Sequence, residues 1–417
     1  YLLGLEIGER RRAAELDGGR NYWLLFGVLL NVAMLACYKY LGMGLELFAG
    51  LFGRSASVQA PTLPVGISFY TFQAISYLAD TAKGTLKPER NPFRFALYIS
   101  LFPQLIAGPI VTYPTLRDQL IRRRETLDGF SAGMVRVVQG LSKKVLLANT
   151  AGAMYELIRS GSYMEGKPGL VLSWLAAFAY AMQIYFDFSG YSDMAVGLGQ
   201  LFGLRLPENF LHPYTAKSIR EFFRKWHVTL SFWFRDYVYI PLGGSRRGNL
   251  RTVRNLLIVW GLTGLWHGAA WNFLLWGLYY GVLLIAERFW LDRVRNALPG
   301  GVQWGLTFLA VTFGWMLFAN TDGGELLEVL GGMVGRYGVV QAGTWGYVRS
   351  FAPLLLLMLA LAVGLPERLF GALQARTEHR HPLASGILTC GAYGVLAVLC
   401  IAGLVSDSYQ PFLYFRF

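Results

Sequence analysis

The stretch LVLSWLAAFAYAMQIYFD, residues 170–187, decides the fold class because it carries no charged side chain before its last residue, Asp187. A helix of about 20 predominantly apolar residues crosses the hydrocarbon core of a bilayer. A helix that is hydrophobic all round is otherwise found only in a deep protein core. The stretch therefore predicts a membrane-spanning helix, and similar stretches lie on both sides of it.

The composition indicates the same class of protein. Of the 417 residues, 54% are hydrophobic and 15% are charged, whereas soluble domains carry about 25% charged residues. The polar residues are bunched between apolar segments long enough to cross, or nearly cross, a bilayer. These segments lie near residues 22–42, 62–81, 93–111, 170–187, 253–269, 271–290, 303–319, 351–365 and 384–405. We predict an all-α, polytopic membrane helix bundle.

Proline and glycine interrupt the apolar segments at Pro64–Gly66, Pro103, Gly108-Pro109 and Pro241–Gly244. Non-helical backbone at membrane depth is tolerated only where it is buried in protein or lines a water-filled cavity. Two further helices, near 129–148 and 216–240, carry too many basic residues to cross alone, and such helices lie in the interface or line a cavity. We expect re-entrant and interfacial helices around a central funnel or tunnel, in a single domain over residues 1–417.

The formal net charge of +13 points either to nucleic acid or to a membrane surface. The basic residues lie in short loops beside apolar segments, and no RNA- or DNA-recognition motif accompanies them. Short cytoplasmic loops of membrane proteins carry such an excess of Lys and Arg. The basic loops are at Arg10–Arg12, Arg122–Arg124, Lys143-Lys144 and Arg246–Arg254. We predict no nucleic-acid partner and a cytoplasmic position for these loops.

The three cysteines, Cys37, Cys390 and Cys400, lie in apolar segments. Their spacing matches neither a disulfide framework nor a metal site. We therefore expect small core side chains and no metal.

Two of the five histidines are candidates for catalysis. His267, in GLWHGAAWN (residues 264–272), lies between two strongly apolar segments, where an ionisable side chain marks a functional site. Its neutral imidazole can take a proton from a hydroxyl near neutral pH, or it is simply hydrogen-bonded between helices. His227, in FRKWHVT (residues 223–229), is a second site residue or one more polar residue of an interfacial helix. We expect structural or solvated positions for His212, His379 and His381.

The loop PLGGSRRG, residues 241–248, combines glycines with arginines. Such a loop can approach a phosphate, as the tail of coenzyme A would require. Ser245 and Arg246 are then the candidate contacts. A glycine turn followed by cytoplasmic anchor charges explains the loop equally well, and it matches no P-loop.

Asp187 and Asp193 leave a second function open. Acids near the end of a membrane-spanning segment can serve as proton-relay groups of a transporter, or they are ion-paired structural residues. The sequence has no G-x-S-x-G motif of a serine hydrolase and no H-E-x-x-H motif of a metalloprotease.

Several of these motifs together resemble one family. The stretch QIYFDFSGYSD (183–193), the run from Arg220 to Gly248 and the triplet Trp266-His267-Gly268 are similar to the membrane-bound O-acyltransferase (MBOAT) family. PVGISFY (64–70) and the ending PFLYFRF (411–417) fit its branch of bacterial polysaccharide acetylases, related to the alginate O-acetylase AlgI. The resemblance covers nearly the whole chain. Because the family usually has further membrane helices before the first residue of this chain, we expect natural N-terminal helices to be missing.

The resemblance implies an O-acyltransferase in the bacterial inner membrane, without a bound cofactor. An acyl thioester, expected to be acetyl-coenzyme A, would arrive from the cytoplasm. The family's invariant histidine matches His267, which would act as general base on the acceptor hydroxyl. The second histidine matches His227, which would orient the donor or stabilise charge on the thioester oxygen. Asn272 and Trp266 are further candidates for substrate binding.

The resemblance also implies an acceptor on the far side of the membrane. The expected polymer is alginate or a similar exopolysaccharide, reached through periplasmic partner proteins that receive the acetyl group. The alternative function is a proton-coupled transporter or flippase.

Overall fold

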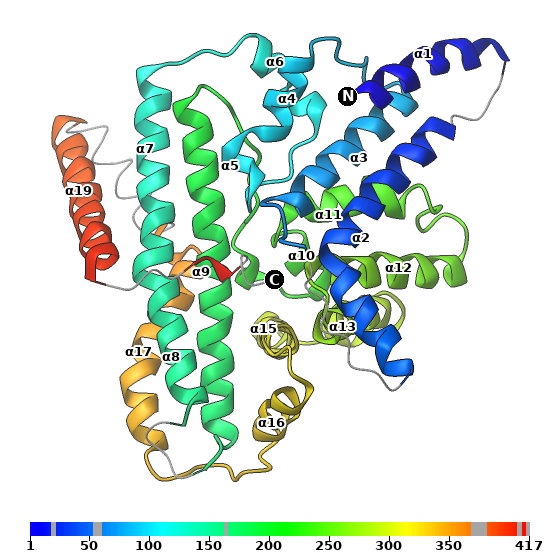
Figure 1. Cartoon of the computed structure of the whole chain (residues 1–417). Coiled ribbons are helices and arrows are strands. Elements are labelled where there is room, and N and C mark those ends of the chain that lie inside the picture. The colour runs from blue at the N-terminus through cyan, green and yellow to red at the C-terminus, as the bar shows by residue number, and fades with distance from the viewer. Residues whose placement is uncertain (18–21, 53–60, 162–165, 368–381, 407–410, 414–417) are drawn as a thin grey trace.

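The computed structural model describes the chain except residues 18–21, 53–60, 162–165, 368–381, 407–410 and 414–417, so His379 and His381 lie outside the described residues. The described residues form helices and no strand (Figure 1), which confirms the predicted all-α fold.

The first helices are α1 (Leu2–Asp17), α2 (Tyr22–Leu51), α3 (Ile67–Lys83), α4 (Pro92–Ser100), α5 (Phe102–Leu105), α6 (Tyr113–Ile121), α7 (Leu127–Ser142), the π-helical η1 (Lys143–Ala148) and α8 (Asn149–Arg159). The next are α9 (Leu170–Leu201), η2 (Pro213–Thr215), α10 (Ile219–Phe223), α11 (Val228–Phe234), η3 (Arg235–Tyr239) and α12 (Asn249–His267). The last are α13 (Trp271–Ala286), η4 (Glu287–Leu291), α14 (Asp292–Asn296), α15 (Gly300–Ala319), α16 (Gly323–Met333), α17 (Thr344–Ala362) and α19 (Pro382–Ser406).

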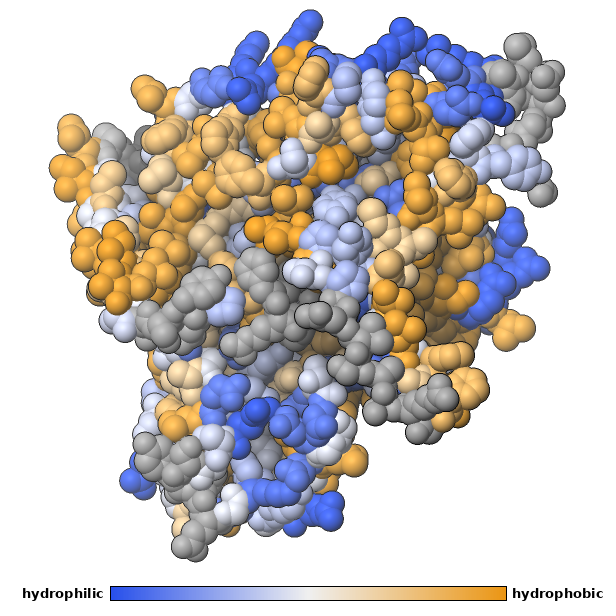
Figure 2. Space-filling view, viewed as in Figure 1, coloured by the Kyte–Doolittle hydropathy of each residue, from blue (hydrophilic) through white to orange (hydrophobic). Residues whose placement is uncertain are grey.

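Six of the described helices are long and apolar enough to cross a membrane. They are Tyr22–Leu51, Leu170–Leu201, Trp271–Asn296, Gly300–Ala319, Thr344–Ala362 and Ser385–Ser406. On the face shown in Figure 2, hydrophobic residues cover much of the middle, and hydrophilic residues gather at the upper edge and the lower end. The chain is a multi-pass membrane protein.

Three of the predicted apolar segments take other forms. Segment 62–81 becomes α3, which has 17 residues and is largely buried. Segment 93–111 is broken, because α4 ends at Ser100 and only the short α5 follows. The break falls at Leu101, whose backbone is extended, and Pro103 follows in the first turn of α5, where proline is tolerated. Segment 253–269 belongs to α12, which begins earlier, at Asn249, and ends at His267.

The segment 216–240, predicted as one amphipathic helix, is divided into α10, α11 and η3. The division falls at His227, whose φ of 45° is left-handed and therefore uncommon for a residue other than glycine. The start of α10 is fixed by the buried Glu287, which accepts hydrogen bonds from the backbone N–H groups of Ile219 (2.6 Å) and Arg220 (3.0 Å). These short helices build the wall of a cavity described below.

Helix α9 contacts α8, α15 and α17, and α7 packs along it (Figure 1). A Cβ atom at Gly190 would lie 2.7 Å from the carbonyl oxygen of Gly140, and one at Gly197 would lie 2.7 Å from that of Gly133. Glycine thus lets the two antiparallel backbones touch, as small residues do between membrane helices. The predicted segment 129–148 forms α7 and η1, and it continues directly into α8.

The expectation of core positions for the cysteines was wrong for two of them. Cys400 is buried, but Cys37 and Cys390 are exposed. Both lie on helices, α2 and α19, whose apolar side chains are largely exposed on the outside of the bundle.

Candidate active site

His227 and His267 line the same cavity, which has a volume of ≈ 310 Å³ and is called the histidine cavity below. His227 stands between α10 and α11, and His267 is the last residue of α12. The Trp266 ring lies near both, with its centroid 6.2 Å from the His227 ring and 4.8 Å from the His267 ring. The structure therefore brings together two histidines that are far apart in the sequence.

Aromatic rings surround the His267 imidazole. Besides Trp266, the rings of Trp276 and Phe318 lie near it, with centroids at 5.0 Å and 5.2 Å. These rings come from α13 and α15, so both helices contact His267. The imidazole is thus held in an apolar setting where its neutral form is favoured.

Helix α2 supplies the end cap of α12. The Lys39 ammonium donates hydrogen bonds to the carbonyl oxygens of Trp266 and His267, the latter at 3.0 Å. The Tyr40 hydroxyl donates to the carbonyl of Leu265. The last carbonyls of a helix have no partner within it, and a cation is favourable there. The sequence signal of this contact is a lone lysine in the apolar segment 22–42, which was not among the predicted site residues.

His227 is almost completely buried, with 2% of its surface exposed. Its Nδ1 lies 3.1 Å from the side-chain oxygen of Asn209, and its Nε2 makes no hydrogen bond to a described residue. Burial lowers the pKa of His227 to about 3. The ring is therefore neutral across the physiological pH range.

Arginines line the outer end of the histidine cavity: Arg220, Arg224, Arg235 and Arg288. Helix α13 and the following η4 connect this end to the inner one, and at about 1.5 Å per residue the twelve residues from Trp276 to Arg288 rise about 18 Å. The walls between are aromatic, with Phe223, Trp226 and Trp260 among them. The cavity is thus a deep, mostly apolar channel with cations at its mouth and two histidines at its inner end.

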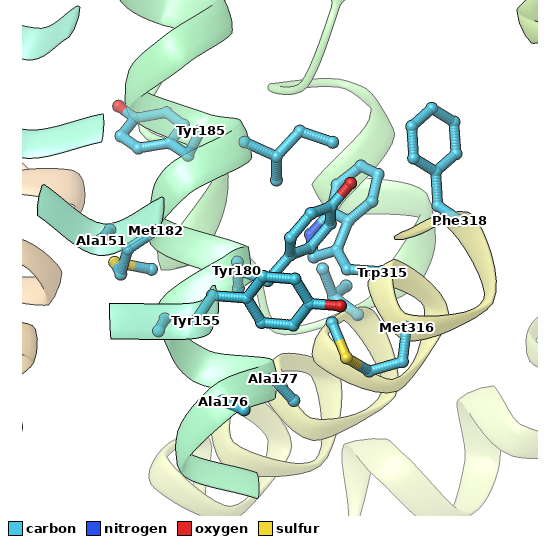
Figure 3. Packing of buried hydrophobic residues seen from close by; sticks show 14 of the residues in the cluster. Ala151, Tyr155, Ala176, Ala177, Tyr180, Met182, Tyr185, Trp315, Met316 and Phe318 are labelled. Carbon is cyan, nitrogen blue, oxygen red and sulfur yellow. The ribbon is translucent and has the colours of Figure 1, made fainter. Parts of the chain in front are cut away.

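A second cavity, of ≈ 30 Å³, also has His267 in its lining, together with Asp187 and Leu413. A third, of ≈ 350 Å³, is lined by Tyr155 and Asn320 among others. Figure 3 shows the packing near these two cavities, where Tyr155 of α8 reaches toward Met316 of α15, with Trp315 just before it on that helix and Phe318 farther along.

The third cavity lies at the opposite end of the α13–α15 pair from Arg288. The two helices are antiparallel, because the Asn272 side-chain amide donates to the Phe318 carbonyl (2.9 Å) and the Tyr280 hydroxyl to the Val311 carbonyl (3.3 Å). Asn320, at the end of α15, lines the third cavity. Space for small molecules thus exists on both sides of His267.

Of the other predicted site residues, Trp266 lies at the histidines, whereas Asn272, Ser245 and Arg246 do not line their cavity. Trp266 is buried, and its indole N–H donates to the Ser68 carbonyl at 3.4 Å. Asn272 is buried and bonded to α15, outside the lining of the histidine cavity. Ser245 and Arg246 are exposed on their loop and do not line it either.

Asp187 and Asp193 are in ion pairs. Lys144 lies 2.6 Å from Asp187, and Lys143 lies 2.6 Å from Asp193. Arg136 also contacts Asp193, at 2.7 Å. Each carboxylate is thus held against at least one basic side chain, the arrangement expected of structural ion pairs. These contacts favour the structural interpretation of the two acids over the transporter alternative.

Comparison with known proteins places these residues in a family. The sequence profile of the membrane-bound O-acyltransferase family matches residues 88–319. The chain is 38% identical to the probable alginate O-acetylase AlgI of Pseudomonas putida, over 100% of this chain and 88% of that protein. It is 35% identical to the peptidoglycan O-acetyltransferase of Helicobacter pylori, over 81% and 69%, and 29% identical to the teichoic acid D-alanyltransferase of Bacillus subtilis, over 61% and 68%. With both cavity histidines inside the matched region, the chain belongs to the membrane-bound O-acyltransferase family and is an O-acyltransferase.

Proposed function

We propose that this O-acyltransferase moves an acetyl group from acetyl-coenzyme A, on the cytoplasmic side of the bacterial inner membrane, to a hydroxyl acceptor on the opposite side. The observation that carries the proposal is the histidine cavity, with cations at its mouth and two imidazoles at its inner end. No other cavity described above combines these features.

The shape of the cavity supports a donor with a long arm and phosphates. An arm that carries a thioester must extend about 18 Å, the rise of a helix over twelve residues, to reach from Arg288 to the level of Trp276 beside His267. Arg224 and Arg288 are exposed and form no ion pair with a described acid. Free guanidinium groups bind phosphate oxygens in a bidentate manner. Coenzyme A has both the arm and the phosphates.

In the proposed reaction, the acceptor hydroxyl oxygen attacks the thioester carbonyl carbon. His267 takes the hydroxyl proton, the carbon–sulfur bond breaks, and the proton passes to the departing thiolate, so that ester and free thiol are the products. His267 suits this role because it lines two cavities, the histidine cavity and the smaller one that also contains Asp187 and Leu413 in its lining. His227, which lines only the larger of the two, would orient the donor.

The acceptor class comes from the relatives. One is named for alginate, one for peptidoglycan and one for teichoic acid. We propose alginate or a similar exopolysaccharide, because the alginate-associated relative matches over the whole chain. Periplasmic partner proteins would carry the acetyl group from the membrane to the polymer.

Release of free thiol tests the proposal. The purified protein in detergent is mixed with acetyl-coenzyme A, and thiol is measured with and without a hydroxyl-bearing acceptor. We expect protein-dependent release that the acceptor accelerates. Absence of release with acetyl-coenzyme A, but release with an acyl carrier protein thioester, would overturn the proposed donor. Absence with both would overturn the proposed function.

A further inference from the structure

Asn209 and His227 form a buried pair at the inner end of the histidine cavity. Asn209 is 0% exposed. Its Oδ1 accepts hydrogen bonds from the backbone N–H of Thr229 (3.3 Å) and from the Thr229 hydroxyl (2.9 Å), and lies 3.1 Å from Nδ1 of His227. The Thr229 hydroxyl oxygen in turn accepts from the backbone N–H of Ile110 at 3.0 Å. Three groups thus meet at the amide oxygen of Asn209, and the backbone N–H of Ile110 meets the Thr229 hydroxyl.

The direction of every hydrogen bond in this network is fixed. A backbone N–H can only donate, so the Asn209 atom that meets it is the carbonyl oxygen and not the amide nitrogen. That oxygen can only accept, so Nδ1 of His227 must carry a hydrogen. A neutral imidazole has one N–H, and His227 is neutral because it is buried. Nε2 therefore carries a lone pair, and it has no partner among the described residues.

The backbone around the pair is also fixed. The N–H of Val228 donates to the backbone carbonyl of Asn209 at 3.0 Å. His227, directly before Val228, has the left-handed φ of 45°. Non-glycine residues in such conformations persist only where their surroundings impose them, and they cluster at functional sites. The ring of His227 thus has little freedom to turn and present Nδ1 in place of Nε2.

We propose that Asn209 is a positioning residue that holds His227 in the Nδ1–H tautomer and so makes Nε2 a hydrogen-bond acceptor for the acyl donor. The partner is an amide N–H of the arm that carries the thioester. This rests on the proposed function for the identity of the ligand, whereas the tautomer follows from the network itself. Stabilising negative charge on the thioester oxygen needs a hydrogen-bond donor, and neutral Nε2 has none. Of the two roles expected for His227, orienting the donor is the one that this tautomer supports.

Nitrogen NMR tests the tautomer without any activity. The protein is labelled with 15N-histidine in detergent or lipid, and the His227 signals are identified by their loss in His227→Gln. We expect a protonated Nδ1 and an unprotonated Nε2. In Asn209→Leu the two nitrogens should average or exchange roles. The matched control is Asn255→Leu, since Asn255 is equally buried but bonds only to Arg254 and the 242–244 loop; it should leave the His227 signals unchanged. A protonated Nε2 in the unaltered protein would overturn the proposal.

Kinetics with two variants separate positioning from packing. The Nδ2 atom of Asn209 makes no hydrogen bond to a described residue, so replacing it by oxygen in Asn209→Asp breaks none of these bonds. The carboxylate accepts the same three hydrogens and raises the pKa of His227. We expect Asn209→Asp to be active at high pH, with its acidic limit moved to higher pH. Asn209→Leu should lose about 10- to 100-fold in kcat/KM for acetyl-coenzyme A at every pH, as expected for a misplaced buried hydrogen bond.

The outcomes are distinguishable. Equal loss in both variants with an unshifted pH profile would mean a packing role and would refute the inference. If Asn209→Leu does not fold, the pH profile of Asn209→Asp and the nitrogen spectrum of the unaltered protein still test the inference. A protein with the expected tautomer but no thiol release would contradict the proposed function and leave the tautomer standing.

Discussion

The four arginines at the mouth of the histidine cavity are of two kinds. Arg220 lies 3.4 Å from Asp292, and Arg235 is 2.6 Å from Asp236. The other two, Arg224 and Arg288, are not paired with a described acid. A cation that already has a carboxylate partner has less to gain from a phosphate, so the unpaired arginines should carry more of the donor binding.

Arg224→Ala and Arg288→Ala should each raise the KM for acetyl-coenzyme A by roughly tenfold, the effect of about 1.4 kcal/mol from one lost charged hydrogen bond. The effect should shrink at high salt, because these side chains are exposed. The KM for acetyl-pantetheine, which lacks the nucleotide phosphates, should stay the same. Steady-state thiol release measures both.

Arg246→Ala is the matched control for this prediction. Arg246 is an exposed arginine on the 241–248 loop, outside the cavity lining. A raised KM in Arg246→Ala with none in the two cavity variants would instead locate the phosphates on the loop.

At the scale of single residues, the sequence pointed to the two histidines as candidates but not to the residues that surround them. His267 was singled out because an ionisable side chain is unusual between apolar segments, and His227 became a candidate through the resemblance of its motif to the family. Asn209 and Glu287 were missed, since a single amide or acid gives no pattern and acts only through folded contacts. Arginines 224 and 288 could not be told from the other basic residues until the cavity between them was known.

Between elements, Lys39 and Tyr40 tie α2 to the end of α12 that carries His267. Most of α2 is exposed on the outside of the bundle, and besides this contact it packs against α3 and α1. Loss of the contact should loosen the last turn of α12 more than the rest of the fold.

Lys39→Met keeps the length and apolar stem of the side chain but removes its hydrogen bonds. We expect roughly tenfold lower kcat, from about 1–3 kcal/mol of lost hydrogen bonding to the carbonyls, with the donor KM little changed. Lys39→Arg can still donate to both carbonyls and should recover much of the activity. Equal activity of the methionine variant and the unaltered protein would show that the contact does not position His267.

The glycine contacts between α7 and α9 make a separate prediction. Gly197→Ala places a Cβ atom 2.7 Å from the Gly133 carbonyl oxygen, so the helices must move apart, at a cost of about 1–3 kcal/mol. Gly305→Ala on α15 is the control, because nothing lies within 4 Å of its added Cβ. Thermal unfolding in detergent should show a lower midpoint for the first variant only. A similar midpoint for both would mean that the two backbones are not in contact.

The sequence predicted elements well where they are long and apolar, and poorly where they are broken. Residues 170–187, 271–290 and 303–319 all fall in candidate membrane spans. Segment 216–240 has an amphipathic pattern on both sides of His227, whose left-handed backbone divides the helix. The pattern alone does not reveal such a break. Backbone conformation at His227 depends on Asn209, which lies in a different segment.

For the whole molecule, the orientation in the membrane follows from the basic loops. We predict that the loop containing Ser245 faces the cytoplasm. The exposed Cys37 and Cys390 are first replaced by serine, whereas Cys400 is buried and can stay. Ser245→Cys should then resist an impermeant thiol reagent in intact cells and react after permeabilisation. Reaction in intact cells would reverse the orientation, and with it the side from which the donor enters.

The central claim is acyl transfer at His267 from one side of the membrane to the other, and transfer in sealed proteoliposomes tests it most directly. Acetyl-coenzyme A is supplied outside, a membrane-impermeant hydroxyl acceptor is enclosed inside, and acetyl ester on the enclosed acceptor is measured. We predict ester formation by the unaltered protein and a loss of about 10²- to 10⁴-fold in His267→Gln, the usual contribution of a general base. Comparable ester formation by a folded His267→Gln protein, or transfer only when donor and acceptor share one side, would contradict the account.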